Sequence, residues 1–247
     1  MYAWNKIKII NDLWYDKSIE LILFRNNQSW VKYLSDKLKV NFINNGKSGN
    51  PNSIIFNSVI DDVTTGRIKK GDLVGILWSS SLRDYAAFLP RHQWVSWSVK
   101  HLINRPDKFI DSYKSNNDRY DLFLREYKTF FLENLFNQNY YNIVNQNYII
   151  FLQKLFEFYG IKYVMADAFD MMVVDPNEKD DVSNMIKTKY YLEYRKKTMR
   201  DFLYESKSDC FEDIKMMSKN PAQHPNILGY NLISVEFNNY IVKNNII

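Results

Sequence analysis

Short runs of apolar residues alternate with longer segments of helical periodicity along much of the chain. The runs at 7–10, 40–43, 73–78 and 161–166 are four to six residues long and are dominated by Ile, Val, Leu and aromatic side chains. Runs of this length and composition are typical of strands buried on both faces of a sheet. We therefore predict four buried strands at these positions.

The segments between and after these runs repeat their apolar residues every three or four positions, as helices do. Trp30, Leu34 and Leu38 predict a helix over 30–38, and Pro51, which suits a first helical turn, predicts another over 51–63. Further helices are expected at 118–159, 180–204 and 226–242.

Strands that alternate with helices at this spacing indicate an α/β fold with a parallel sheet covered on both faces. We expect a three-layer α/β/α architecture, flavodoxin-like in outline, with about five strands. The 247 residues contain no Gly/Pro/Ser-rich linker, so we predict a single domain over 1–247 with a helical insertion at about 84–160.

Composition narrows the class of protein without naming a function. The net charge is +5, but the charges are dispersed along the chain, which favours a solvated mixed surface over a nucleic-acid interface. One cysteine excludes an internal disulfide, and no signal peptide or transmembrane run is evident. We expect a soluble protein, cytoplasmic or virion-associated. The 16% aromatic content indicates a large core or a surface for a partner.

Ligands of open parallel sheets bind beyond the carboxyl ends of the strands. In this chain the segments 11–15, 44–52, 78–84 and 167–170 follow the predicted strands. The loop before the last helix carries His224 and could return to the same edge. These loops are the expected place for any chemistry.

The loops carry a resemblance to the SGNH (GDSL-type) hydrolases. The first family block, Gly-Asp-Ser and an apolar residue after the first strand, resembles NDLW, with Asp12 at the Asp position and Leu13 at the serine. The second block resembles NFINNGKSGNPNSI, with Gly49 at the glycine that donates to the oxyanion.

The later blocks resemble a variant that is common among phage-encoded members. GILWSSSLRD has its Trp-Ser-x-x-x-Arg pattern in Trp78, Ser79 and Arg83, and the family's Asn position falls near Ser80. PAQHPNILG keeps His224, whereas the Asp that orients the histidine in the family is replaced by Pro or Ala. The resemblance thus implies an α/β/α hydrolase fold with a remnant site formed by Asp12, Leu13, Gly49, Ser80 and His224.

A serine esterase needs a hydroxyl nucleophile, a base and donors for the oxyanion. Leu13 has no nucleophilic atom, so no catalytic residue is assigned with assurance. Each remnant residue also has a structural interpretation: His224 packs before the last helix, Asp12 caps a helix and Gly49 forms a turn. Loop serines usually bond to backbone, but a displaced nucleophile remains an alternative among Ser18, Ser79, Ser80 and Ser81.

Metal and cofactor sites find little support in the sequence. Asp167 and Asp170 follow a strand and could hold a cation, although solvated loop carboxylates are the simpler interpretation. No phosphate-binding glycine loop and no paired ligand for Cys210 occur, so we expect no cofactor and no metal.

Two functional hypotheses follow. The first is an SGNH-like protein without esterase activity that serves as a structural or binding component, for example of a phage or viral particle. The second is an active ester hydrolase, such as a carbohydrate O-deacetylase, that uses a displaced serine. Expected partners are protein neighbours or a second copy, with a glycan as a further candidate and no membrane.

The segment 84–104 is the candidate contact region. It is rich in aromatics, and Trp94 and Trp97 would share one face if the chain were helical after Pro90. With Trp78 and Arg83 these two residues are the predicted binding residues. Packing within the chain, a partner interface and a lid or glycan platform remain open for them.

Overall fold

The computed structural model describes the backbone alone for 6–10, 83–88 and 93–98. It describes backbone and side chains for most of the remaining residues, namely 27–46, 50–80, 130, 137–169, 182–206, 210 and 225–247, except that the backbone alone is described at 138 and 183.

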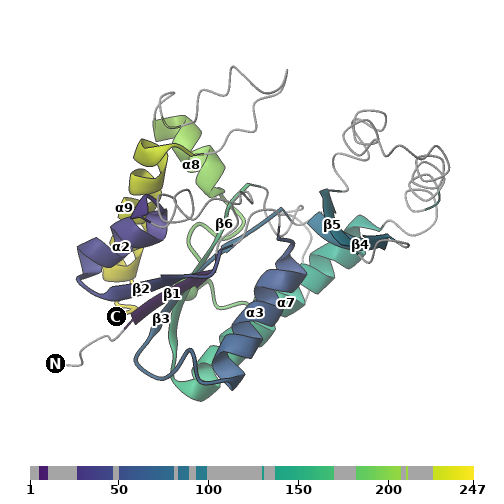
Figure 1. Ribbon diagram of the computed structural model, residues 1–247, viewed down its shortest axis with the longest axis horizontal. Coiled ribbons are helices and arrows are strands. Elements are labelled where there is room, and N and C mark those ends of the chain that lie inside the picture. The colour runs from purple at the N-terminus through teal and green to yellow at the C-terminus, as the bar shows by residue number, and fades with distance from the viewer. Residues whose placement is uncertain are drawn as a thin grey trace.

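Four parallel strands form the central sheet (Figure 1). Their order is β2 (Asn41–Asn44), β1 (Lys6–Ile10), β3 (Leu73–Trp78) and β6 (Lys162–Asp167). Ile9 on β1 lies between Asn44 on β2 and Gly75 on β3, which fixes the register across the middle of the sheet. All four strands predicted from apolar runs are confirmed within one residue at each end.

A fifth position in the sheet is occupied by a single bridge. Tyr191 pairs in parallel with Met165 on β6, and the Leu192 amide donates to the Met165 carbonyl at 2.8 Å. The described part of the central sheet therefore has four strands and one bridge where about five strands were predicted.

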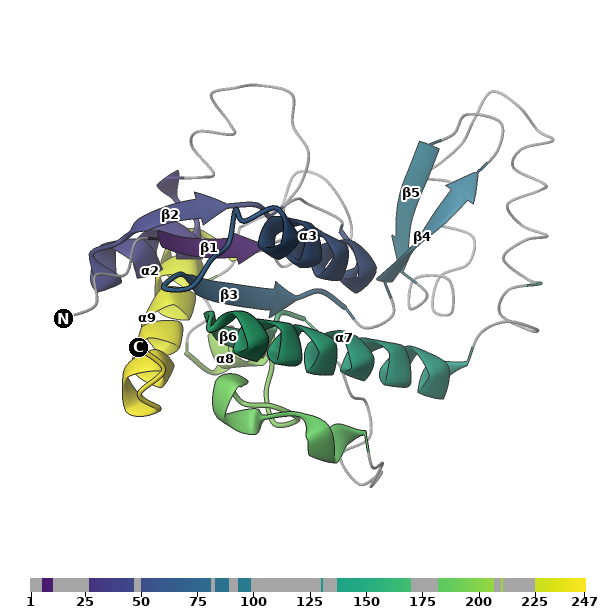
Figure 2. The same cartoon turned by 90° about the horizontal axis from the view of Figure 1, so that it is seen from below.

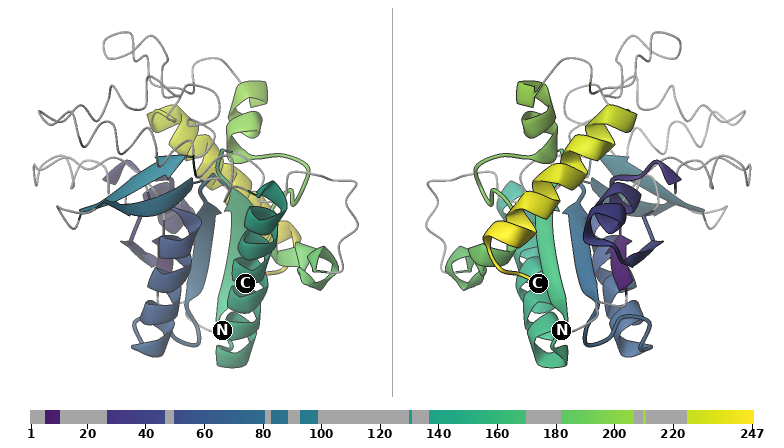
Figure 3. Two further views of the ribbon diagram at one scale, coloured as in Figure 1. Left: turned by 90° about the vertical axis from the view of Figure 1, so that its right-hand side faces the viewer. Right: turned by 90° about the vertical axis from the view of Figure 1, so that its left-hand side faces the viewer.

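Helices cover both faces of the sheet, as Figure 3 shows from the two ends. α2 (Trp30–Leu38) and α9 (Ile227–Lys243) pack on one face, and α3 (Asn52–Thr64) and α7 (Gln138–Tyr159) pack on the other. The chain moves from β1 to β2 in one direction and then back across to β3 and β6. The helices change face at that reversal, as right-handed crossovers require. The predicted three-layer α/β/α fold is confirmed.

Strand β3 shows why the sheet is buried on both faces. Leu73 and Leu77 belong to the core cluster under α2 and α9, whereas Val74, Ile76 and Trp78 belong to the cluster under α3 and α7. Alternate residues of a strand point to opposite faces, so a continuous apolar run serves both layers.

Side chains and glycines set the helix ends. Ser29 caps α2 by accepting from the Lys32 amide, and Asn226 caps α9 by accepting from the Gly229 amide at 3.0 Å. Gly160 ends α7 in the left-handed conformation, with φ of 63°. No helix in the described part of the chain is long and apolar enough to cross a membrane.

Residues 93–98 are not helical, so the condition under which Trp94 and Trp97 would share a face is not met. β4 (Arg83–Phe88) and β5 (Gln93–Ser98) form an antiparallel pair in which Trp94 is opposite Ala87 and Trp97 is opposite Asp84. Positions three apart fall on opposite faces of a strand, so 94 and 97 do not share a face. One face of this strand carries Trp94, Ser96 and Ser98, and the other carries Val95 and Trp97. Apolar and polar residues therefore do not alternate strictly, and the local pattern does not decide between strand and helix.

The continuous helix expected at 180–204 is also wrong. The chain forms two short turns, η2 (Ser183–Met185) and η3 (Thr188–Tyr190), and becomes α-helical only in α8 (Met199–Ser206). Glu193 and Arg195 adopt positive φ after Tyr191 has joined the sheet edge, which interrupts any helix. Thr198 and Asp201 then exchange hydrogen bonds in a capping box that starts α8. Of the segment predicted helical at 118–159, α7 confirms the part from Gln138 onward.

Candidate functional site

The sheet has one topological switch point, between β1 and β3. The chain continues from β1 to β2 on one side of this point and from β3 to β6 on the other side. Ile10 of β1 pairs with Ile76 of β3 near the carboxyl ends of the two strands. In open α/β sheets the crevice outside such a pair of strand ends is the usual ligand site. The described residues beyond the end of β3 are therefore the candidate site.

Several residues predicted for this site lie outside the described residues. They are Ser18 and Ser81, together with Asp12, Leu13, Gly49 and His224. Their roles stay predictions. The same holds for the side chains of Arg83, Trp94 and Trp97, whose backbone alone is described.

Asn52 organises the described part of the site. It is the first residue of α3, and its side-chain carbonyl accepts from the Ser79 amide at 2.8 Å. Its amide nitrogen lies 3.4 Å from the carbonyl oxygens of both Ser79 and Ser80. The Asn52 side chain therefore pairs with the backbone of β3 just beyond the last strand residue, where the ladder no longer satisfies these groups.

Helix α7 completes this network from the neighbouring helix. The Asn52 amide also lies 3.2 Å from the side-chain oxygen of Asn145. Asn142, Asn145 and Gln146 are all buried, on the face that carries Ile149, Leu152 and Phe156 further along the helix. The inward face of α7 is thus polar near the site and apolar over the rest of the sheet.

The two described serines at the end of β3 are closed off from solvent. Ser79 is 1% exposed and Ser80 is 6% exposed. Among the described residues, no group forms a hydrogen bond with the Ser79 hydroxyl. An unsatisfied buried hydroxyl costs free energy, so its presence calls for a physical explanation. Within this part of the chain the Ser79 hydroxyl shows no paired base such as a nucleophile requires.

Asp167, at the end of β6, is bound by a tyrosine. The Tyr191 hydroxyl donates to the Asp167 carboxylate at 2.5 Å, and both residues are buried. Burial, and then the adjacent carboxylate, raise the pKa of Tyr191 well above its ordinary value. For Asp167 a solvated loop carboxylate was the favoured interpretation and a cation site with Asp170 the alternative; Asp167 is buried instead, and Asp170 lies outside the described residues. No group of three acidic, His or Cys side chains suited to a metal occurs in the described part of the chain.

Trp78 is part of the core. Its side chain is fully buried in the cluster between the sheet and helices α3 and α7. A side chain in this position contributes to packing and cannot contact a partner at the surface, so we do not carry Trp78 forward as a binding residue.

The block that includes Asn226 and Gly229 has a clear structural role. The Asn226 side chain caps α9, and the Asn226 backbone N–H donates to the Cys210 carbonyl at 2.9 Å. A Cβ atom at Gly229 would lie 2.5 Å from that same carbonyl oxygen, closer than real contacts allow. The N-x-x-G spacing therefore docks the start of α9 against the backbone at Cys210.

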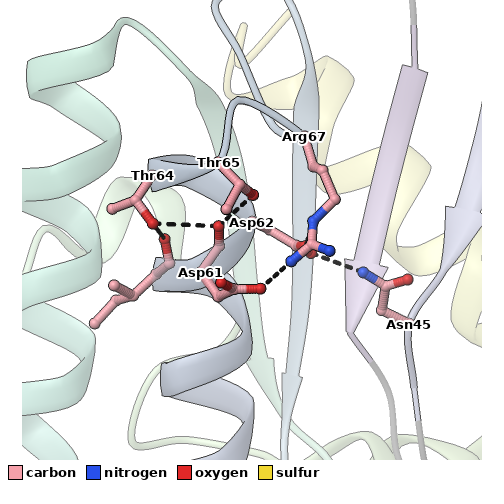
Figure 4. Close-up of polar contacts among 7 residues, drawn as sticks. Asn45, Asp61, Asp62, Thr64, Thr65 and Arg67 are labelled. Atoms are coloured by element: carbon pink, nitrogen blue, oxygen red, sulfur yellow. Dashed lines mark hydrogen bonds and ion pairs between the residues drawn. The ribbon is translucent and has the colours of Figure 1, made fainter.

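A second polar cluster lies at the C-terminal end of α3 (Figure 4). Arg67 forms ion pairs with Asp61 and, through Nε at 2.7 Å, with Asp62, and Asn45 donates to Asp62 at 2.7 Å. A pocket of about 320 Å³ beside it is lined by Asp62, Arg67, Asn45 and neighbours. The charges are paired with each other, so this cluster fastens α3 to the end of β2.

Sequence reasoning missed Asn52, Asn145 and Tyr191. A signal existed for Asn145, because it lies at helical spacing with Ile149 and Leu152, which the structure buries. Asn52 stands directly after Pro51, where a polar residue is usually taken as part of a helix start. Tyr191 had no local signal, since its partner Asp167 is 24 residues away.

Solved structures of hydrolases are similar to this chain at low sequence identity. An alpha/beta hydrolase enzyme from the metagenome of Lake Arreo has a TM-score of 0.49 and 13% identity, over 99% of this chain and 97% of that one. The psychrotrophic esterase EstA from Pseudoalteromonas has a TM-score of 0.44 and 14% identity, over 97% of each chain. A member of the lipolytic protein G-D-S-L family from Veillonella parvula has a TM-score of 0.43 and 11% identity, over 94% of each chain.

The Veillonella protein is of the family that the sequence blocks resemble. No protein-family model and no curated protein matches the chain. Similarity this remote carries no argument for activity, and the α/β/α assignment rests on the order and direction of the strands.

Proposed function

We propose that this chain is an SGNH-hydrolase-like protein that does not turn over esters by a serine mechanism and acts as a structural or binding component. The burial of Ser79 and Ser80 at the carboxyl end of β3 supports this most directly, because the described hydroxyls at the switch point are closed to substrate. The resemblance of the first sequence block also supports it, because that block sets Leu13 at the position of the nucleophilic serine.

The chemistry of the Asn52 network supports the same proposal. An oxyanion hole needs donors that point at an open position beside the nucleophile. The Asn52 amide instead faces the carbonyls of Ser79 and Ser80 and the side chain of Asn145. These donors hold the end of β3 in place, which is a structural task.

A protein of this kind would keep its fold for contacts with neighbours. We favour protein neighbours or a second copy as partners, with a glycan as the further candidate, and a phage or viral particle is one setting that suits such a component. The aromatic content of 16% supports a contact role, and the dispersed net charge of +5 gives no support for nucleic acid.

One observation favours the alternative, an esterase with a displaced serine. The Ser79 hydroxyl is buried at the expected edge of the sheet and has no partner among the described residues. A polar group kept at such a cost is sometimes a catalytic group. In this alternative Ser79 is the nucleophile and must be reached by a base and by substrate.

Turnover of an aryl acetate and release of acetate from an acetylated polysaccharide distinguish the two. We expect rates indistinguishable from buffer for the wild type, for Ser79→Ala and for the control Ser35→Ala. Leu13→Ser should remain inactive as well, because the position of the residue that orients the histidine is also changed. Turnover by the wild type that Ser79→Ala abolishes and Ser35→Ala retains would establish the esterase instead.

A further inference from the structure

Helix α7, which Figure 2 shows lying beside α3 along the sheet, carries exposed large apolar side chains on its outer face. We define the α7 stripe by six exposed residues spaced three or four apart, namely Tyr140, Ile143, Asn147, Phe151, Lys154 and Phe158. The opposite face of the helix fills the core, so the stripe is additional to the residues that α7 needs for packing.

The exposure within this stripe is large for apolar residues. Phe158 is 83% exposed, Tyr140 is 62%, Phe151 is 51% and Ile143 is 45%. Phe151 also contacts Phe56 of α3 edge-on, with ring centroids 5.4 Å apart, so the apolar surface continues onto the neighbouring helix. Single exposed apolar residues are ordinary, whereas four on one face of one helix, separated only by Asn147 and Lys154, indicate a contact surface.

We propose that the α7 stripe binds the same stripe of a second copy of this chain. The two α7 helices are antiparallel, and the two-fold axis passes between them at the level of position 149, midway between Asn147 and Phe151. This inference does not rest on the loss of esterase activity, because α7 buries its other face on the sheet in either case.

The order of residues along the stripe is self-complementary in this arrangement. Positions equidistant from 149 face each other across a two-fold axis, which places Tyr140 opposite Phe158 and Asn147 opposite Phe151. Ile143 then lies opposite the turn that holds Lys154, whose methylene stem can cover it. Each aromatic ring thus meets a ring or a neutral side chain.

The charges select the antiparallel arrangement over the parallel one. Lys154 is the one charged residue of the stripe, and it lies 3.8 Å from Glu157 on the same helix. Parallel helices would set the two Lys154 ammonium groups side by side. Antiparallel helices separate them by about 15 Å along the axis, beyond the screening length of about 8 Å at physiological ionic strength.

The area of the stripe is of the order that a dimer requires. At about 200 Å² for each large side chain, the exposed fractions of the four apolar residues amount to roughly 500 Å². A stable interface buries about 800 Å² on each partner. Asn147, Lys154 and the neighbouring surface of α3 supply the remainder.

Sedimentation equilibrium of the full chain tests the surface. The wild type should be a dimer, and Phe158→Glu and Phe151→Glu should each raise the dissociation constant about 100-fold or more. Val242→Glu is the matched control, because Val242 is 61% exposed on α9, across the sheet, and its change should leave the dimer intact. A wild type that is monomeric at every concentration, or a dimer that both glutamates leave unchanged, overturns the proposal. So does a monomer that binds phospholipid vesicles through Phe158.

Disulfide trapping tests the orientation. Tyr140→Cys and Phe158→Cys chains, mixed under oxidising conditions, should cross-link to each other in preference to themselves, and the buried Cys210 should stay free. A majority of 140–140 and 158–158 products would show a parallel pair and overturn the two-fold arrangement.

Discussion

The two ends of helix α3 carry polar clusters that are built in opposite ways. At its start, Asn52 uses a neutral amide, almost wholly buried, to bind the backbone of Ser79 and the side chain of Asn145. At its end, Arg67 pairs with Asp61 and Asp62, and the side chains of Arg67 and Asp61 are more than half exposed. Neutral groups can be buried once their hydrogen bonds are made, whereas charges are far more costly to bury. We therefore expect the start of α3, at the candidate site, to contribute more to stability than its end.

Asn52→Ala should cause the largest loss. It removes one well-formed buried hydrogen bond, to Ser79, and leaves the groups around it unsatisfied, so we expect the free energy of unfolding to fall by about 3 kcal/mol. Urea denaturation measures this. Asn57→Ala, an exposed position of the same helix, is the control and should change stability by less than about 0.5 kcal/mol. Equal effects from the two variants would contradict the structural role of the network.

Tyr191→Phe should be the next largest. It leaves the buried Asp167 carboxylate without its 2.5 Å donor, at a cost of about 2 kcal/mol, whereas the exposed Tyr159→Phe should cost almost nothing. Stability should depend on pH in a defined direction. Because the pKa of Tyr191 is raised in the fold, the unfolded chain ionises first as pH rises through the ordinary value of 10.0, and the folded state loses stability above that pH. Tyr191→Phe should reduce this loss, and an unchanged pH profile would argue against the buried contact.

Arg67→Ala should have a smaller effect, about 1 kcal/mol, because the pair with Asp61 is exposed and screened, and the buried Asp62 keeps its hydrogen bond from Asn45. The difference from wild type should shrink in 1 M salt, and the exposed control Lys37→Ala should lie near zero. If Arg67→Ala were more damaging than Asn52→Ala, the comparison between the two ends of α3 would be reversed.

Ser79→Ala should have the smallest effect of the series. Its hydroxyl has no partner among the described residues, so its removal should be neutral or stabilise by about 0.5 kcal/mol. Ser35 is equally buried but donates to the Lys32 carbonyl at 2.7 Å, and Ser35→Ala should cost about 1 kcal/mol. A clear loss of stability from Ser79→Ala would reveal a partner for its hydroxyl.

The sequence predicted the sheet and most of its helices because those elements follow local rules. Leu73–Trp78 is a continuous apolar run, and α9 starts at a capping Asn226, so each could be recognised within its own segment. The shared helical face considered for Trp94 and Trp97 does not form, because the pairing of 93–98 with 83–88 decides the conformation of this segment. The segment 180–204 was misjudged because Tyr191 belongs to a sheet edge formed by distant residues.

The candidate site was predicted less well for the same reason. Its location at the carboxyl end of β3 follows from the strand order, and Ser79 and Ser80 were recognised there. The residues that bind this edge are Asn52 and Asn145, which lie 93 positions apart and are joined by tertiary structure alone. The loss of the nucleophile at Leu13 could be read only from the resemblance of short blocks, and it stays a prediction.

Treatment of the full chain with a fluorophosphonate probe, followed by measurement of its intact mass, tests the proposal that this protein has no serine-hydrolase site. We expect an unmodified mass for the wild type after prolonged exposure, while an active serine esterase in the same tube is fully labelled. Stoichiometric addition of one probe, mapped by peptide analysis to Ser79, Ser80, Ser81 or Ser18, would contradict it and identify the nucleophile of an ester hydrolase.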